Sequence, residues 1–197
     1  MRRMPFICLM TIYCCIALFG QLAWAEHYDF HQHSFPRTVV LAESGDVLKL
    51  FGVGLHKKYF QDDYFGAFYA QRLLKTPEEV LADEGPKQMV ITYLRAQNVP
   101  GEYWEAAINL NNSPDLVKLE QIRVSQFIRI VNQPMHLNDT VIIEYVPKVG
   151  TKIIIRGNIR GIIKGSEFYS LILKVWMGRE PPSKKFRKDL FVLSDLT

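Results

Sequence analysis

The distribution of cysteines constrains this chain more than any other feature of its sequence. All three, Cys8, Cys14 and Cys15, lie within the first fifteen of 197 residues. They belong to a stretch of 25 residues that has two arginines directly after Met1, an apolar run over residues 6–20, and Ala-Trp-Ala at 23–25. This is the pattern of a secretory signal peptide, and the run is shorter than the roughly 20 residues of a membrane-spanning helix. We predict a signal peptide over residues 1–25, with an uncleaved N-terminal anchor as the alternative.

Cleavage after Ala25 would leave a chain without cysteine, so its fold must be held by an apolar core and not by disulfides. A content of 48% hydrophobic and 22% charged residues is ordinary for a globular domain. Without Arg2 and Arg3 the chain has 22 basic and 20 acidic residues, a net charge of +2. Because no basic stripe remains, we expect no nucleic-acid binding. We expect a periplasmic or secreted protein with no membrane span after cleavage.

The organisation after residue 25 is that of one domain that mixes strands and helices. Residues 26–36 are polar and rich in histidine, which predicts a flexible arm before a domain over residues 37–197. Runs rich in Val, Ile, Tyr and Phe predict strands at 37–42, 47–53, 59–71, 87–95, 139–146, 152–156 and 159–164. Helical signals cover 76–85, 100–112, 114–131, 166–177 and a short segment from Ser183.

Three local features give sharper expectations. Over residues 114–131 the apolar side chains, Leu119 among them, share about half of a helical wheel, with only Ile122 outside it. Glu120 and Arg123 lie three residues apart on that helix, where side chains can meet. Gly157-Asn158 predicts a two-residue hairpin turn of type II′, and Gly66 a bulge or a close approach within its strand.

Few residues offer chemistry. The sequence contains no P-loop, GxGxxG, GxSxG or HExxH motif. His27, His31 and His33 could hold copper or zinc, or could be exposed side chains that bind nothing. A basic run at 184–188 is either a solvated face or a contact with anionic lipid. We predict no cofactor.

Aromatic residues are dense from Tyr59 to Tyr69 and at Tyr103-Trp104. A ligand cavity lined by such residues also needs a few convergent polar groups. The candidates are His56, Tyr64, Arg95 and Tyr103. Each could instead be an ordinary residue of the core or its rim.

Several short motifs occur in one order along the chain. Residues 48–58 read LKLFGVGLHKK and residues 64–69 read YFGAFY; then come NDTV at 138–141, YVP at 145–147, GT at 150–151, IKGSEF at 163–168 and VWMG at 175–178. Together they resemble the bacterial chalcone isomerase-like domain family, whose first motif is L-x-L-x-G-x-G-x-R-x-K. The resemblance covers about residues 36–193. It implies an α+β fold, a large antiparallel sheet covered on one face by a layer of helices.

The resemblance also implies a ligand cleft between sheet and helices. Plant relatives close a flavanone ring by intramolecular addition, and other relatives bind fatty acids without catalysis. His56 stands where the family pattern has arginine, and a neutral histidine is a poor substitute for holding an anion, although a protonated one could do so. In the resemblance, Tyr64 occupies the position of the enzymes' threonine and Tyr103 could match their tyrosine before the helix, while Leu110, seven residues further on, stands where they have asparagine.

We therefore expect a non-catalytic protein that binds a small apolar or amphipathic ligand, such as a fatty acid, through His56, Tyr64, Arg95 and Tyr103. Two alternatives remain: an isomerase (intramolecular lyase) that uses His56 and Tyr103, and a structural partner in an envelope complex.

Overall fold

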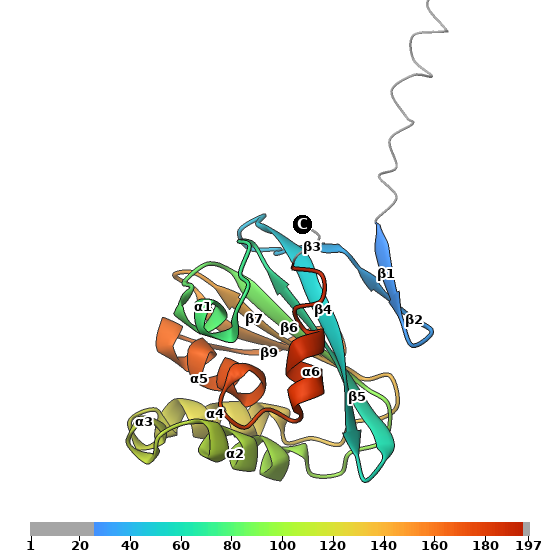
Figure 1. Cartoon of the computed structure of the whole chain (residues 1–197). Coiled ribbons are helices and arrows are strands. Elements are labelled where there is room, and N and C mark those ends of the chain that lie inside the picture. Colours follow the sequence, from blue (N-terminus) through green and yellow to red (C-terminus); the bar gives the residue numbers. More distant parts are fainter. Residues whose placement is uncertain (1–25, 195–197) are drawn as a thin grey trace, which may run out of the picture.

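The computed structural model describes residues 26–194, so the predicted signal peptide lies outside the described residues. Its centre is a seven-stranded antiparallel sheet in which each strand pairs with the next along the chain. The strands are β3 (Thr38–Val40), β4 (Val47–Lys58), β5 (Gln61–Ala70), β6 (Lys87–Tyr93), β7 (Thr140–Val146), β8 (Gly150–Ile155) and β9 (Asn158–Ile163). Figure 1 shows the long strands β4 and β5 as a hairpin that extends past the rest of the sheet.

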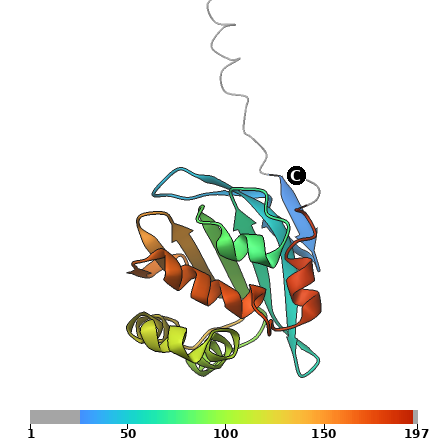
Figure 2. The ribbon, with the colours of Figure 1, turned by 60° about the vertical axis from the view of Figure 1, so that its left-hand side comes forward.

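Helices cover one face of this sheet (Figures 1 and 2). They are α1 (Pro77–Ala82), α2 (Pro100–Asn111), α3 (Pro114–Leu119), α4 (Gln121–Val131), α5 (Ser166–Met177) and α6 (Lys184–Asp189). Thr76 caps α1 by accepting a hydrogen bond from the Glu79 amide, as Ser/Thr-x-x-Glu sequences do. The sheet with a helical layer on one face confirms the fold class expected from sequence.

The segment predicted as a loose arm is a β-hairpin instead. Strands β1 (His27–Phe30) and β2 (His33–Pro36) pair with each other and lie on the sheet face opposite the helices. Phe30, His33 and Phe35 contact the ring of Phe65, with centroids 5.9, 4.7 and 5.7 Å away. The alternating aromatic side chains gave this segment an apolar side, which its polar average composition concealed.

Two apolar cores result, one on each face of the sheet. In the larger one, α5 is buried nearly all round, and Trp104 of α2 packs edge-on against Trp176 of α5 and Phe127 of α4. Ring centroids in these pairs are 5.4 and 5.1 Å apart, within the favourable range for T-shaped aromatic contacts. This packing fixes the position of α2 relative to α5.

The predicted helix over 114–131 is broken into two. Glu120 leaves the helical conformation (φ −92°, ψ 7°), so that α3 ends and α4 begins at this residue. Leu119, expected on the buried side, is therefore exposed, whereas Ile122 is exposed as expected. The predicted contact of Glu120 with Arg123 is confirmed, since Nη1 of Arg123 lies 2.8 Å from both carboxylate oxygens.

Three hairpins turn through two residues that both have positive φ. The turn residues are His31-Gln32, Tyr59-Phe60 and Arg156-Gly157. Positive φ at both positions defines a type I′ turn, so the type II′ turn predicted at Gly157-Asn158 is wrong by one residue and in type. Strand β4 also runs further than expected, and the strand predicted from residue 59 begins at Gln61.

Candidate ligand-binding site

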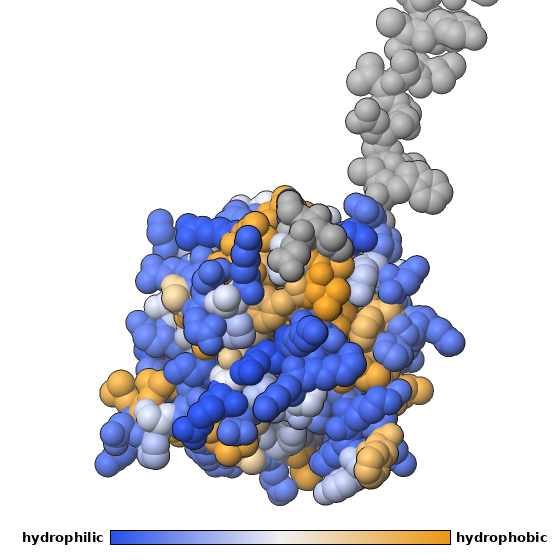
Figure 3. Space-filling view, viewed as in Figure 1, coloured by the Kyte–Doolittle hydropathy of each residue, from blue (hydrophilic) through white to orange (hydrophobic). Residues whose placement is uncertain are grey.

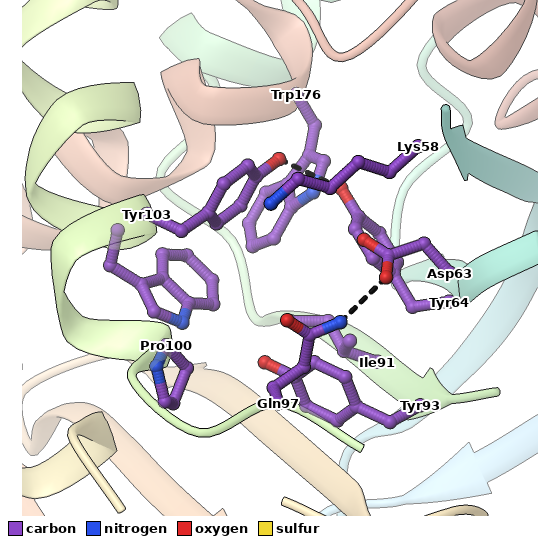
Figure 4. A pocket seen from close by; sticks show the side chains of 10 residues that line it. Lys58, Asp63, Tyr64, Ile91, Tyr93, Gln97, Pro100, Tyr103 and Trp176 are labelled. Carbon is purple, nitrogen blue, oxygen red and sulfur yellow. Dashed lines mark hydrogen bonds between the residues drawn. The ribbon is translucent and has the colours of Figure 1, made fainter. Parts of the chain in front are cut away.

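A small cavity lies between the sheet and the helical layer. Its free volume is about 20 Å³, room for about one water molecule. Ten residues line it: Lys58, Asp63, Tyr64, Ile91, Tyr93, Gln97, Pro100, Tyr103, Trp104 and Trp176. Strands β5 and β6 supply its floor, and α2 and α5 supply its opposite wall (Figure 4).

Two tyrosines meet across this cavity. The hydroxyls of Tyr64, on β5, and Tyr103, on α2, are 3.4 Å apart. Burial raises the pKa of Tyr64 well above its ordinary value, and the neighbouring Tyr103 raises it further. Burial also raises the pKa of Tyr103, which the hydrogen bond with Tyr64 partly offsets. Both phenols are therefore neutral near pH 7, and each can donate a hydrogen bond.

Two indoles add donors to the same cavity. Among the described residues, neither Trp104 nor Trp176 has an acceptor in hydrogen-bond geometry for its Nε1, although both side chains are buried. The Trp176 N–H lies close enough to Tyr64 to offset part of the rise in pKa that burial causes in that phenol. The Trp104 N–H offsets part of the corresponding rise in the pKa of Tyr93. Unpaired buried donors cost stability. The cavity thus has a surplus of donors over acceptors.

Charges stand at the edge of the cavity. The Asp63 carboxylate accepts a hydrogen bond from Gln97 at 2.6 Å and pairs with Nε of Arg95 at 3.2 Å. The half-buried Lys58 reaches over the opening (Figure 4) and, in the described part of the chain, has no carboxylate within ion-pair distance. Asp63 is therefore compensated, and Lys58 is the available cation.

His56 lies behind the two tyrosines. Its ring centroid is 4.8 Å from that of Tyr64 and 6.4 Å from that of Tyr103. Burial lowers the pKa of this imidazole. The Asp63 carboxylate, 3.9 Å away, opposes this decrease, and the charge of Lys58 adds to it. The imidazole is thus kept neutral at neutral pH and supplies no charge to hold an anion.

The sequence candidates divide accordingly. Tyr64 and Tyr103 line the cavity, while His56 packs beside them and Arg95 is engaged with Asp63 and with Gln61 at 2.7 Å. Sequence reasoning missed Lys58, Trp104 and Trp176 as site residues. Lys58 and Trp176 belong to two of the motifs quoted above, which is the signal that could have drawn attention to them.

The three N-terminal histidines do not gather into a metal site. Among the described residues, no group of three or more His, Cys, Asp or Glu side chains is placed to hold a metal ion. His31 lies in the turn of the β1–β2 hairpin against Phe30, with centroids 4.5 Å apart, and His33 packs on Phe65.

A profile of the family described as chalcone isomerase-like matches residues 28–191. The chain belongs to the chalcone isomerase-like family. A comparison with curated proteins finds no match. Among solved structures, a fatty-acid binding protein of Arabidopsis thaliana is similar in fold, with a TM-score of 0.60 and 19% identity, over 86% of this chain and 97% of that one. Within residues 26–194, no helix is both long and apolar enough to cross a bilayer.

The glycines of the family motif have a structural role in this chalcone isomerase-like chain. A Cβ at Gly52 would overlap the backbone of Asp189 and Leu190, and one at Gly54 would lie 2.8 Å from the ring of Phe186. Gly66, on β5, meets the same ring, as its expected close approach predicted. These glycines let α6 lie directly on the hairpin, and Phe186 closes the region next to His56 and Tyr64.

Proposed function

We propose that this protein binds, without catalysis, a small amphipathic molecule with an oxygen-rich head group, such as a fatty acid. The observation that carries the proposal is the set of donors around one cavity: two phenols joined by one long hydrogen bond, and two buried indole N–H groups that have no acceptor among the described residues. A carbonyl or carboxylate oxygen would complete their hydrogen bonds. Ligand sites typically combine an apolar lining with a few such convergent polar groups.

The charges favour an anionic head group. Lys58 is the available cation at the opening, and the only carboxylate in the lining, that of Asp63, is already paired with Arg95. Because the buried phenols have raised pKa values, they act as donors and not as bases. This arrangement suits binding of a carboxylate better than proton abstraction.

Binding of an acyl chain requires side chains to move, since the free volume is only about 20 Å³. Lys58 and Tyr103 are only half-buried. We propose that the head group enters between them and that the chain displaces apolar side chains toward α2 and α5. The fold similarity to a plant fatty-acid binding protein supports this choice of ligand.

Tryptophan fluorescence tests the proposal directly. Of the three tryptophans in the chain, Trp24 lies in the predicted signal peptide, and the other two line the cavity. In a protein of residues 26–197, emission therefore reports on this site alone. Titration with laurate should change the emission saturably, and native mass spectrometry should show one bound fatty acid.

The matched variants are Tyr103→Phe and Tyr28→Phe. Tyr103→Phe should weaken laurate binding about tenfold, because a hydrogen bond to a charged group contributes roughly 1.5–3 kcal/mol. Tyr28→Phe, on the hairpin across the sheet, should leave binding unchanged. No binding by the parent protein, or equal loss in both variants, would refute the proposal. Turnover of a chalcone that is lost in Tyr103→Phe would support the isomerase instead.

We also propose export to the periplasm or the cell exterior, supported by the signal-like pattern of residues 1–25. The processed protein should begin at Glu26, which N-terminal sequencing of the accumulated protein would check. A protein that retains Met1 and the apolar run would contradict cleavage.

A further inference from the structure

The tip of the long β4–β5 hairpin carries two exposed aromatic side chains. Lys58 of β4 lies opposite Gln61 of β5 in the strand register, so Tyr59 and Phe60 between them are the two turn residues. Their exposed fractions are 82% and 99%. Both ribbon views show this hairpin projecting beyond the body of the domain, and apolar atoms stand out near its end in the space-filling view (Figures 1, 2 and 3).

Tyr59 and Phe60 are unfavourable residues for the backbone conformation of this turn. Tyr59 and Phe60 have φ of 50° and 66°, in the left-handed region that bulky residues rarely adopt. Type I′ turns favour Asn-Gly or Asp-Gly. The two other turns of this kind place His31-Gln32 and Arg156-Gly157 at the same positions, so aromatic residues are not needed to make the turn in this fold. Costly local conformations tend to be retained where they serve function.

The charges that flank the tip differ in whether they are paired within the described part of the chain. Lys57 pairs with Asp62 at 2.8 Å, whereas the Lys58 ammonium lies 5.9 Å from the centre of the Tyr59 ring. Two further apolar side chains are exposed in loops connected to the cavity lining. Val99, 55% exposed, directly precedes Pro100 of the cavity, and Leu137, 61% exposed, lies two residues after Met135, which bridges to Gln97.

We infer that the Tyr59-Phe60 tip inserts into the head-group region of a lipid bilayer and holds the cavity opening against the membrane. Aromatic side chains favour the membrane–water interface, and a lysine beside them can keep its charge among the head groups while its methylenes lie in apolar surroundings. A stable protein partner would need about 1,000 Å² or more of buried surface. Two aromatic residues supply roughly 150–250 Å² each, so a narrow tip suits a bilayer better.

Attachment of the tip to a membrane does not depend on the proposed function. Only the role of the cavity opening as the entrance for a fatty acid rests on it. Lys58 belongs both to the cavity lining and to the hairpin end, directly before Tyr59. A fatty acid leaving the bilayer would meet Lys58 first and the two phenols next. Membrane attachment would thus give a water-insoluble ligand a path that does not cross bulk water.

Co-sedimentation with lipid vesicles tests this inference. The experiment uses residues 26–197, because the sheet, helices and both cores are complete within residues 26–194. The parent protein should sediment with phosphatidylcholine vesicles, and on the order of fivefold better when phosphatidylglycerol is added, since one lysine near an anionic surface contributes about that much.

The decisive variant is Tyr59→Asn with Phe60→Gly, which installs the sequence that this turn prefers. It should lower vesicle binding by roughly tenfold or more, because two aromatic side chains no longer leave water, while its Tm stays equal or rises. The control, His31→Asn with Gln32→Gly, makes the same change in another type I′ turn and should bind as the parent does. Equal binding by the tip variant and the parent, or no binding by the parent to either kind of vesicle, would overturn the inference; the latter would direct attention to a protein partner.

Laurate titration without vesicles separates the two proposals. The tip variant should bind laurate with the affinity of the parent, because no cavity residue has changed. If the parent binds vesicles through the tip but takes up no laurate, the proposed function fails and the docking surface stands. If laurate binds and vesicles do not, the reverse holds.

Discussion

Two clusters that contain buried polar side chains lie on opposite faces of the same sheet, and they differ in whether their polar groups are compensated within the described part of the chain. On the face away from the helices, the ammonium of Lys152 pairs with Glu144 and Glu43, and Gln88 donates to Glu144 at 2.8 Å. On the helical face, the cluster of Tyr64, Tyr103 and the two indoles contains two N–H donors, those of the indoles, for which residues 26–194 supply no acceptor. Each cluster contains side chains that are almost completely buried, so burial alone does not mark the site.

The difference lies in what each cluster lacks. The charges of the Lys152 cluster are compensated from within the chain, and the two glutamates raise the pKa of Lys152 beyond the opposing effect of its burial. Such a cluster contributes to the folded state and has no need of a ligand. The tyrosine–tryptophan cluster gains hydrogen bonds only when an acceptor arrives, which is the property expected of a binding site.

The largest expected effect on stability comes from Lys152→Met. This change leaves Glu144 buried without its cation, and breaking one partner of a buried ion pair costs on the order of 3 kcal/mol. Urea unfolding should show that loss in the free energy of unfolding. Lys118→Met, at an exposed position of α3, is the control and should change little. A loss below about 1 kcal/mol for Lys152→Met would mean that the two clusters do not differ in this way.

A smaller effect is expected from Tyr64→Phe in the unsatisfied cluster. The one hydrogen bond of its hydroxyl within the described part of the chain is long, 3.4 Å to Tyr103, so its removal should cost about 1 kcal/mol or less in the free energy of unfolding. Laurate affinity should fall several-fold in the same variant, as read from tryptophan emission. A large loss of stability with unchanged affinity would show instead that Tyr64 serves the core.

The fold was accessible from sequence because apolar alternation and punctuation by Gly and Pro are local signals. The predictions from sequence were wrong where local signals mislead. Tyr59-Phe60 lacks turn chemistry, so the end of β4 was missed, and the break at Glu120 lies within an unbroken apolar pattern. The hairpin at residues 27–36 depends on Phe65, nearly thirty residues beyond it, for its packing.

Only about half of the candidate site could be predicted from the sequence. Aromatic density and the family motif indicated Tyr64 and Tyr103, which the fold brings together. That burial lowers the pKa of His56, that Arg95 is committed to Asp63 and that Lys58 has no carboxylate within ion-pair distance among the described residues are properties of three-dimensional neighbours. No spacing along the chain records which donors remain without acceptors.

The smallest effect expected concerns His56 and pH. Burial lowers the pKa of this imidazole from 6.5, against the opposing influence of Asp63 and with a further decrease from Lys58. The unfolded chain therefore takes up a proton at a higher pH than the folded chain does. The neutral form of His56 contributes stability above about pH 6.5, and that contribution is lost as the pH falls through the pKa that His56 has in the folded chain.

In His56→Gln, the decline in Tm below pH 6.5 should become shallower than in the parent, since a group that must stay neutral in the fold has been removed. Parallel Tm–pH profiles would show that His56 is protonated as readily in the folded chain as in the unfolded one. A cationic imidazole beside Tyr64 would then join Lys58 in attracting an anion, and laurate affinity in His56→Gln should fall as far as it does in Tyr103→Phe.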